Sequence, residues 1–160
     1  MEGVPVEIKE FLRKKALGLR EAIPLEERVE KSRRIEERLL ALTPYHEAAT
    51  LHFYLSTRSE VMTEGMVRAS LSGGKRVVVP VVDPSRKAIE LSEIRDYDRE
   101  LTSGYRGIPE PVPSARRPVS LEQLDLMVLP VVAFDPRGYR VGYGAGFYDR
   151  LLGGIQGKRP

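Results

Sequence analysis

Apolar residues recur at helical spacing in the first half of the chain. They predict one helix over residues 7–22 and a second from Pro24 to about Leu42, since proline suits a first helical turn. A shorter helix is expected from Thr63, whose side chain would cap it, to about Leu71.

Continuous apolar runs are rich in β-branched residues, which is typical of buried strands. We predict strands at residues 49–55, 75–82, 88–94 and 124–134, the last with the strongest signal. Strands that alternate with helices favour a largely parallel sheet covered on both faces, a three-layer α/β/α architecture. Such sheets bind ligands at the carboxyl ends of their strands, so the loops after Leu55, Val82 and Phe134 should meet.

Two other segments are predicted to be loops. Residues 96–118 are rich in proline, glycine and charge, and we expect one long ordered loop there, a kind of segment that often binds ligands. The Asp-Pro-Arg-Gly sequence at residues 135–138 suits a type I turn. A glycine-rich loop over residues 142–146 then leads into a helix predicted from Phe147.

Composition narrows the chemistry. The 160 residues fit one domain, and they include no cysteine and two histidines, which argues against disulfides, a cysteine nucleophile and a multi-histidine metal site. The net charge of +3 suits small anions and nucleic acid equally, while 19 arginines against 7 lysines favour bidentate phosphate or carboxylate binding. The apolar runs are far shorter than the roughly 20 residues of a membrane span, and residues 1–11 do not read as a secretory signal. We therefore expect a cytoplasmic protein without membrane association.

The candidate chemistry is concentrated in residues 134–150, FDPRGYRVGYGAGFYDR. The alternating glycines would let the backbone approach an anion closely. Arg140 would add a bidentate phosphate contact, and Asp149 would offer an oxygen ligand to magnesium. The alternative is a plain loop in which Asp149 pairs with Arg150 or Arg140. The segment fits neither the P-loop pattern nor the G-x-G-x-x-G dinucleotide turn.

This segment resembles the signature of the 5-formyltetrahydrofolate cyclo-ligase family, also called 5,10-methenyltetrahydrofolate synthetase. The signature reads roughly P-G-x-A-F-D-x-x-G-x-R-L-G-x-G-x-G-Y-Y-D, which is long and specific. The chain departs from it at Val131, where the family usually has glycine, and at Ala145 and Phe147, which replace a frequent glycine and tyrosine. The matching residues are Phe134, Asp135, Gly138, Arg140, Gly142, Gly144, Gly146, Tyr148, Asp149 and Arg150.

The resemblance extends over most of the chain. It includes K-x-x-L-R at residues 9–13, Ser32 in the second helix, Y-x-S…E-V-x-T at residues 54–63, G-K-x-x-x-x-P at residues 74–80 and I-x-E-P at residues 108–111. It implies a Rossmann-like fold of the NagB, RpiA and CoA-transferase type. The family continues through another strand and a C-terminal segment, so we expect residues 1–160 to be a single domain that lacks that segment.

The resemblance also implies roles for individual residues. Arg140 and Tyr143 would act at the reacting groups, and Asp149 would hold Mg²⁺. The folate would contact Leu55, Glu60, Tyr143 and Phe147. ATP would be held by Lys9, Arg13, Arg140, Val141, Gly142, Tyr143, Gly144, Ala145, Gly146, Phe147 and Tyr148. Outside this set, Lys75 would either face phosphate or mark a strand end, and we interpret His52 as a core residue.

The reaction that the resemblance implies converts 5-formyltetrahydrofolate and ATP to 5,10-methenyltetrahydrofolate, ADP and phosphate. The γ-phosphoryl group would pass to the formyl oxygen, and the N10 amine would then attack the formyl carbon while phosphate leaves. Phosphoryl transfer mainly requires alignment and charge neutralisation. No enzyme nucleophile is needed, which agrees with the absence of cysteine.

Two other interpretations stay open. A non-catalytic relative of the same fold would bind folate, nucleotide or RNA, although no RRM-type aromatic strand motif is visible. A phosphosugar isomerase of similar architecture would need no ATP, and it would leave residues 140–149 unexplained. On the preferred interpretation the partners are a reduced folate and ATP, with no nucleic acid, and the protein is a monomer or small homo-oligomer.

Overall fold

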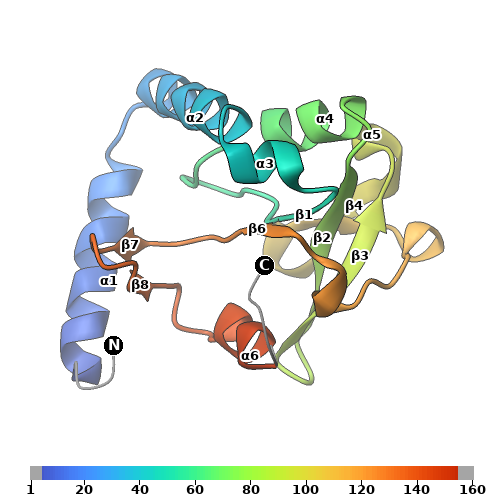
Figure 1. The fold of residues 1–160 in the computed structure, drawn as a ribbon. Coiled ribbons are helices and arrows are strands. Elements are labelled where there is room, and N and C mark those ends of the chain that lie inside the picture. Colours follow the sequence, from blue (N-terminus) through green and yellow to red (C-terminus); the bar gives the residue numbers. More distant parts are fainter. Residues whose placement is uncertain (1–4, 155–160) are drawn as a thin grey trace.

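The computed structural model of the protein describes residues 5–154, so the expectations for residues 1–4 and 155–160 lie outside the described residues (Figure 1). The α-helices are α1 (Val6–Glu21), α2 (Leu25–Leu40), α3 (Thr43–Glu47), α4 (Glu64–Ser72), α5 (Tyr97–Glu100) and α6 (Phe147–Gly153). The strands are β1 (Thr50–Phe53), β2 (Arg76–Asp83), β3 (Ala88–Ile94), β4 (Leu101–Ser103), β5 (Pro109–Pro111), β6 (Leu126–Val128), β7 (Ala133–Phe134) and β8 (Arg140–Val141). Short 3₁₀ turns are η1 (Tyr105–Gly107), η2 (Pro113–Ala115) and η3 (Leu121–Gln123).

A four-stranded sheet in the order β3-β2-β1-β6 forms the centre of the fold. Strand β1 runs parallel to β2 and β6, while β3 returns antiparallel to β2. This confirms the mostly parallel α/β sheet. The carboxyl ends of β1, β2 and β6 lie at one edge, where the binding loops of such sheets are found.

Both faces of the sheet are covered (Figure 1). Helices α2, α3 and α4 lie on one face, where Leu51, Phe53 and Val77 belong to the main core. On the other face α6 and the segment around η3 pack over Val78 and Leu124. Burying each large apolar side chain contributes about 1.5–3 kcal/mol, so these two clusters account for much of the stability.

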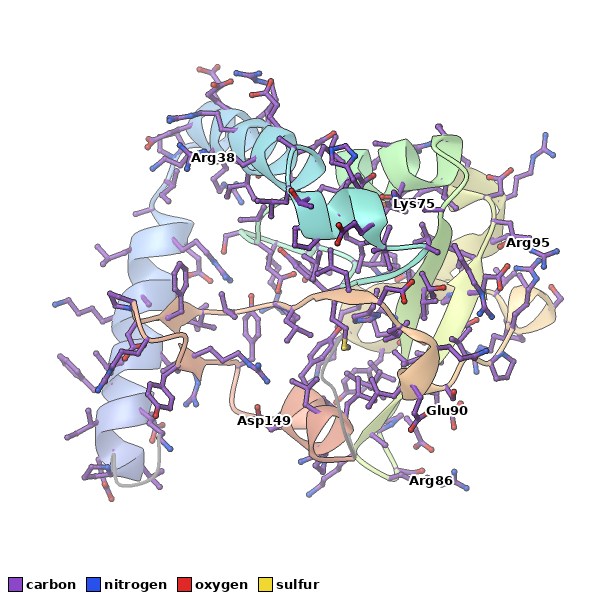
Figure 2. The ribbon with its side chains drawn as sticks, viewed as in Figure 1. Arg38, Lys75, Arg86, Glu90, Arg95 and Asp149 are labelled. Atoms are coloured by element: carbon purple, nitrogen blue, oxygen red, sulfur yellow. The ribbon has the colours of Figure 1, made fainter. Side chains whose placement is uncertain are left out.

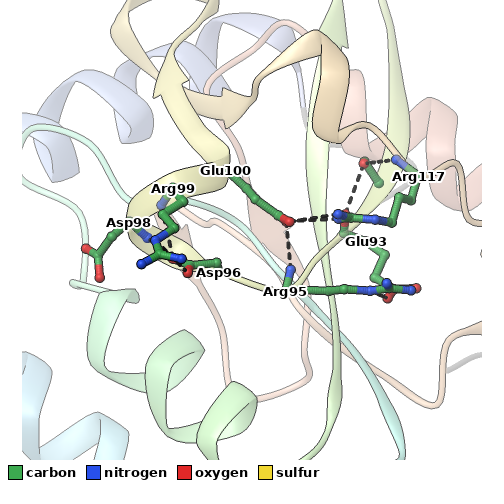
Figure 3. Close-up of polar contacts among 8 residues, drawn as sticks. Glu93, Arg95, Asp96, Asp98, Arg99, Glu100 and Arg117 are labelled. Carbon is green, nitrogen blue, oxygen red and sulfur yellow. Dashed lines mark hydrogen bonds and ion pairs between the residues drawn. The ribbon is translucent and has the colours of Figure 1, made fainter.

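Residues 96–118 are ordered, as expected, but they are not one irregular loop. They contain α5, the antiparallel β4–β5 pair and two 3₁₀ turns. Figure 3 shows the ion pair that closes this segment, Glu100 with Arg117, and the hydrogen bonds that join it to β3 and the residue after it. Glu100 accepts hydrogen bonds from the Arg117 guanidinium at 2.7 and 2.9 Å and from the Arg95 backbone N–H at 2.8 Å. Glu93 accepts from the side chains of Arg76 and Arg95 at 2.7 and 2.9 Å.

The predicted strand over residues 124–134 is wrong. Only β6 pairs with β1, and after it the chain runs without regular structure to β7, which pairs with β8 in a separate two-stranded sheet. Pro130 lies in this interval and has no backbone N–H to donate to a ladder. The chain therefore leaves the sheet at its carboxyl edge, and Phe134, the last residue of the predicted strand, is 76% exposed.

Helix α1 and the β7–β8 hairpin form a second part of the molecule, which we call the arm (residues 6–21 and 133–141). Figure 1 shows α1 beside the hairpin and apart from the central sheet. The periodicity predicted this helix correctly, as it did α2. However, no residue of α1 is buried, and Phe11 is 65% exposed.

Candidate active site

A cleft of about 560 Å³ lies where the arm meets the carboxyl edge of the sheet. The loop after Leu55 and residues 140–149 both line it, as expected, together with Val82 itself. Of residues 83–94 only Ile89 contributes, so the turn after Val82 does not reach the cleft as expected. The charged side chains around the cleft are mostly basic: Lys9, Arg13, Arg58, Arg106 and Arg140, against Glu60 and Asp149. A cleft with this balance of charge attracts anions.

The glycine-rich loop forms one wall of the cleft. Gly144 and Gly146 have φ angles of 98° and 68°, in the left-handed region that favours glycine. A Cβ at Gly144 would lie 3.2 Å from the guanidinium carbon of Arg13. Within residues 5–154 the backbone N–H groups of residues 143–146 donate no hydrogen bond. Since α6 has only seven residues, these amides and the nearby cations, more than a helix dipole, make the wall suitable for phosphate.

Helix α1 brings Lys9 and Arg13 to this loop. The two residues are four positions apart and so share one helical face. Arg13 Nε donates to the Gly142 carbonyl at 2.7 Å, and both side chains line the cleft. The structure thus brings together the basic residues of α1 and the loop that the resemblance placed in one site.

Arg20, which the sequence analysis missed, joins the arm to the other wall. Its guanidinium donates to the Tyr143 hydroxyl at 2.6 Å and to Ser59 Oγ at 3.1 Å. The Tyr143 hydroxyl in turn donates to Glu60 at 2.7 Å. Burial and the Glu60 carboxylate raise the pKa of Tyr143 to about 12. The spacing of seven residues from Arg13 is the signal that could have placed Arg20 on the same face of α1.

The Y-x-S…E-V-x-T pattern at residues 54–63 builds the loop that presents Glu60. The Ser56 and Thr63 backbone N–H groups donate reciprocally to the two hydroxyls, each at 3.1 Å. Thr63 Oγ1 donates to the Tyr54 carbonyl at 2.8 Å. The prediction that the Thr63 side chain caps α4 is therefore wrong, because its hydroxyl is used inside this loop. The Thr57 N–H donates to Glu60 Oε2 at 2.7 Å and orients the carboxylate.

Tyr148 lies between the cleft and the sheet. Its hydroxyl is 3.1 Å from His52 Nε2, and His52 is fully buried in β1, as expected for a core histidine. Burial lowers the pKa of His52 to about 4 and raises the pKa of Tyr148 above its ordinary value. Next to it, the Phe147 ring lies 6.4 Å from the Tyr105 ring across the cleft lining.

Asp149 is at the start of α6, with its side chain 78% exposed (Figure 2). One carboxylate oxygen accepts from Arg140 at 3.0 Å, the pairing that the plain-loop alternative predicted. Within the described residues no group of three or more His, Cys, Asp or Glu side chains is arranged to hold a metal ion. Mg²⁺ usually takes one or two carboxylates and fills its other positions with phosphate oxygens and water. Asp149 can therefore supply one carboxylate ligand to a Mg²⁺ ion that is bound mainly by phosphate oxygens and water.

Lys75 belongs to a different part of the molecule. Its ammonium group donates to the carbonyls of His46 and Ala48, at 3.1 and 2.6 Å, at the end of α3. Figure 2 shows Lys75 near α3 and far from Asp149. Of the two roles considered for Lys75, the structure supports the strand-end one. Fold and cleft together define an α/β protein with a mostly basic cleft at the carboxyl edge of its sheet.

Comparisons of this chain with known proteins identify the family to which it belongs. The sequence model of the 5-formyltetrahydrofolate cyclo-ligase family matches residues 5–160. The Escherichia coli K12 5-formyltetrahydrofolate cyclo-ligase is 33% identical over 133 residues, which is 83% of this chain and 73% of the relative. The probable Caenorhabditis elegans cyclo-ligase is 31% identical over 150 residues, 91% of this chain and 73% of the relative.

A solved structure agrees with these sequence matches. The NMR structure of Aquifex aeolicus 5,10-methenyltetrahydrofolate synthetase has a TM-score of 0.82 at 32% identity, covering 95% of this chain and 75% of that one. The chain belongs to the 5-formyltetrahydrofolate cyclo-ligase family. The comparisons give no support to the non-catalytic alternative.

None of the helices between residues 5 and 154 combines the length and the apolar character that a bilayer-spanning segment needs. The cytoplasmic location, the monomeric or small homo-oligomeric state and the single-domain boundary stay predictions.

Proposed function

We propose that this chain catalyses the ATP-dependent conversion of 5-formyltetrahydrofolate to 5,10-methenyltetrahydrofolate, with release of ADP and phosphate. The observation that carries the proposal is the two-sided cleft. One wall combines free loop amides with Lys9, Arg13 and Arg140, while the other presents the Glu60 carboxylate held by Thr57 and Tyr143. The first wall suits a polyphosphate and the second suits a heterocycle that donates N–H groups.

The basic wall is assigned to ATP. Arg140 and Lys9 supply charge to the phosphates, and the loop over residues 142–146 supplies backbone N–H groups. Arg13 donates to the Gly142 carbonyl, so it positions the loop as well as adding charge. Val141, the last residue of β8 and largely buried, anchors the start of the loop.

The opposite wall is assigned to the reduced folate. Each Glu60 oxygen accepts one hydrogen bond from the protein, which leaves lone pairs for the N–H groups of a pterin. Phe147 lines the same cleft and offers apolar surface to the ring, while Leu55 lies almost fully buried in the cleft lining. The Tyr143 hydroxyl, held between Arg20 and Glu60, would lie beside the reacting formyl group.

Asp149 would supply one carboxylate oxygen to a magnesium ion bound with ATP. When present, Mg²⁺ neutralises charge on the phosphates during transfer. Arg140 contacts Asp149, so this arginine would hold both the carboxylate and the phosphate in place.

In the proposed reaction a formyl oxygen attacks the γ-phosphorus, and the bond to ADP breaks as the new P–O bond forms. The N10 amine then attacks the formyl carbon and loses its proton, and the C–O bond to phosphate breaks to leave the methenyl cation. The protein aligns the two substrates and neutralises phosphate charge through Arg140 and Lys9. With ¹⁸O in the formyl group, the label should appear in the released phosphate; its retention elsewhere would refute the phosphorylated intermediate.

The direct test is the absorbance of methenyltetrahydrofolate formed from 5-formyltetrahydrofolate and Mg-ATP. Wild-type protein should form product only with ATP, and Asp149→Asn should need more Mg²⁺ for half-maximal rate. Asp98→Asn, which removes a surface carboxylate paired with Arg68, is the matched control and should not change the Mg²⁺ requirement. Folded wild-type protein that binds both ligands without forming product would contradict the proposal and favour a binding module.

A further inference from the structure

Three tyrosines that line the cleft form hydrogen bonds with the protein through their hydroxyl groups. Tyr54 donates to the Val61 carbonyl at 3.0 Å, and Tyr143 donates to Glu60 at 2.7 Å. Tyr148 is 3.1 Å from His52 Nε2. A phenol has one O–H to donate and can accept through its oxygen, so the direction of the Tyr148–His52 bond decides what Tyr148 can offer a ligand.

The surroundings of His52 settle that direction. Nδ1 lies 3.1 Å from the Val78 carbonyl oxygen, which can only accept, so Nδ1 must carry the hydrogen. His52 is fully buried and is in contact with no carboxylate in the described hydrogen bonds or ion pairs, so its imidazole is neutral at pH 7. Nε2 therefore has a lone pair, and the Tyr148 hydroxyl donates to it.

Tyr148 differs from Tyr54 and Tyr143 because its hydroxyl oxygen can still accept a hydrogen bond from a ligand. The Tyr143 oxygen already accepts a hydrogen bond from Arg20 at 2.6 Å. Tyr54 is only 9% exposed. The Tyr148 oxygen receives no hydrogen bond from residues 5–154, and the residue lies in the first turn of α6 at the cleft wall.

We propose that the His52–Tyr148 pair is a specificity element that fixes the Tyr148 phenol as a hydrogen-bond acceptor for an N–H group of the bound ligand. This inference rests on the proposed function. Two ligands of that reaction carry such a group: the pterin ring of the reduced folate has ring N–H and amino donors, and the adenine of ATP has an exocyclic amino group. His52 is a positioning residue, since it acts only through Tyr148.

Two variants test the pair. Tyr148→Phe removes the acceptor oxygen and keeps the ring. His52→Leu removes the partner that fixes the phenol, so the hydroxyl can turn and donate. Tyr45→Phe is the matched control, because it removes a buried tyrosine hydroxyl that lies 3.0 Å from Ser70 in the main core, away from the cleft.

The measurement is calorimetric binding of 5-formyltetrahydrofolate alone and of ATP alone. Tyr148→Phe should weaken the binding of one of the two ligands about tenfold and leave the other within about twofold. His52→Leu should weaken the same ligand, and Tyr45→Phe neither. If the affected ligand is ATP, discrimination against GTP should also fall, since guanine has a carbonyl acceptor where adenine has the amino group.

The other outcomes overturn the inference. Unchanged binding of both ligands to Tyr148→Phe would show that the oxygen accepts nothing from a ligand, and an equal loss for both would show a general disturbance of the cleft. If His52→Leu fails to fold, the binding data for Tyr148→Phe decide whether the Tyr148 oxygen accepts a hydrogen bond from a ligand. If the wild-type protein binds neither ligand, the proposed function is wrong, and this inference fails with it. If the wild-type protein binds both ligands and the variants bind them equally well, only this inference is wrong.

Discussion

The central sheet and the arm are held together by different interactions. In the sheet, Leu51 and Phe53 of β1 are fully buried between helices and neighbouring strands. In the arm, α1 buries no residue, and its described polar links to the rest of the molecule come largely from Arg13 and Arg20. Polar contacts at a surface contribute little net free energy, whereas apolar burial contributes much. Substitutions in the sheet should therefore change stability, and those in the arm should change the site.

The basic residues beside the sheet and those around the cleft also differ in whether they form ion pairs. Beside the sheet, Arg117 is paired with Glu100 (Figure 3). Arg76 is paired with Glu93, and both arginines fix structure there. Around the cleft, Lys9, Arg58 and Arg106 form no ion pair with any residue between 5 and 154. Arg58 and Arg106 also have positive φ angles of 53° and 54°, a costly conformation that tends to occur at functional sites. Unpaired cations there are available to an anionic ligand.

The largest expected effect is on the stability of the sheet. Phe53→Ala should lower the free energy of unfolding by about 3–5 kcal/mol, because it leaves a cavity in the core. Phe11→Ala, the matched change in the arm, should cost less than about 0.5 kcal/mol, since Phe11 is 65% exposed. Urea unfolding of both variants measures the difference. Equal losses would mean that α1 is packed against the body more closely than the structure shows.

A substitution of a polar residue in the arm should instead lower catalytic activity more than stability. Arg20→Ala should reduce kcat/KM roughly 30-fold, about 2 kcal/mol, because Tyr143 and Glu60 lose the group that orients them. Its unfolding free energy should fall by less than about 1 kcal/mol. Arg34→Ala, on the exposed face of α2, serves as the control and should change neither quantity.

Steady-state kinetics and thermal unfolding, run on the same preparations, decide between the two effects. A large fall in stability of Arg20→Ala with unchanged kcat/KM would contradict the division between sheet and arm.

The smallest of the three effects concerns acid stability. The Arg117 guanidinium lowers the pKa of Glu100 from 4.5 to about 2. Because the folded pKa is depressed, this contribution is complete above pH 4.5 and is lost as the pH falls towards 2. Wild type should lose on the order of 1–2 kcal/mol more stability between about pH 5 and pH 3 than Glu100→Gln does. Urea unfolding at both pH values measures this loss, and parallel pH curves would rule out the role assigned to Glu100.

The core of the fold could be predicted from the sequence because burial imposes a pattern on it. The periodicity of α1 and α2 and the apolar runs of β1 and β2 each indicated the correct element. The same signal failed over residues 124–134, where apolar composition continues after the hydrogen bonds to β1 end. It also missed the short elements within residues 96–118, since three-residue strands are too short to show a period.

The candidate site was only partly visible in the sequence. The glycine-rich loop and its basic residues were found because the alternating glycines and the motif are local. Arg20 and the contact between His52 and Tyr148 were not, because Arg20 is 123 residues from Tyr143 and His52 is 96 residues from Tyr148. Contacts over such separations depend on the tertiary fold, which no local pattern encodes.

The division of the cleft into two walls is the central claim, and paired binding measurements test it most directly. Calorimetric titration of wild type, Arg140→Ala and Glu60→Gln with ATP and, separately, with 5-formyltetrahydrofolate gives six dissociation constants. Arg140→Ala should weaken ATP binding about tenfold and leave folate binding unchanged, and Glu60→Gln should do the opposite. Loss of the same ligand in both variants, or equal loss of both ligands in each, would contradict the account.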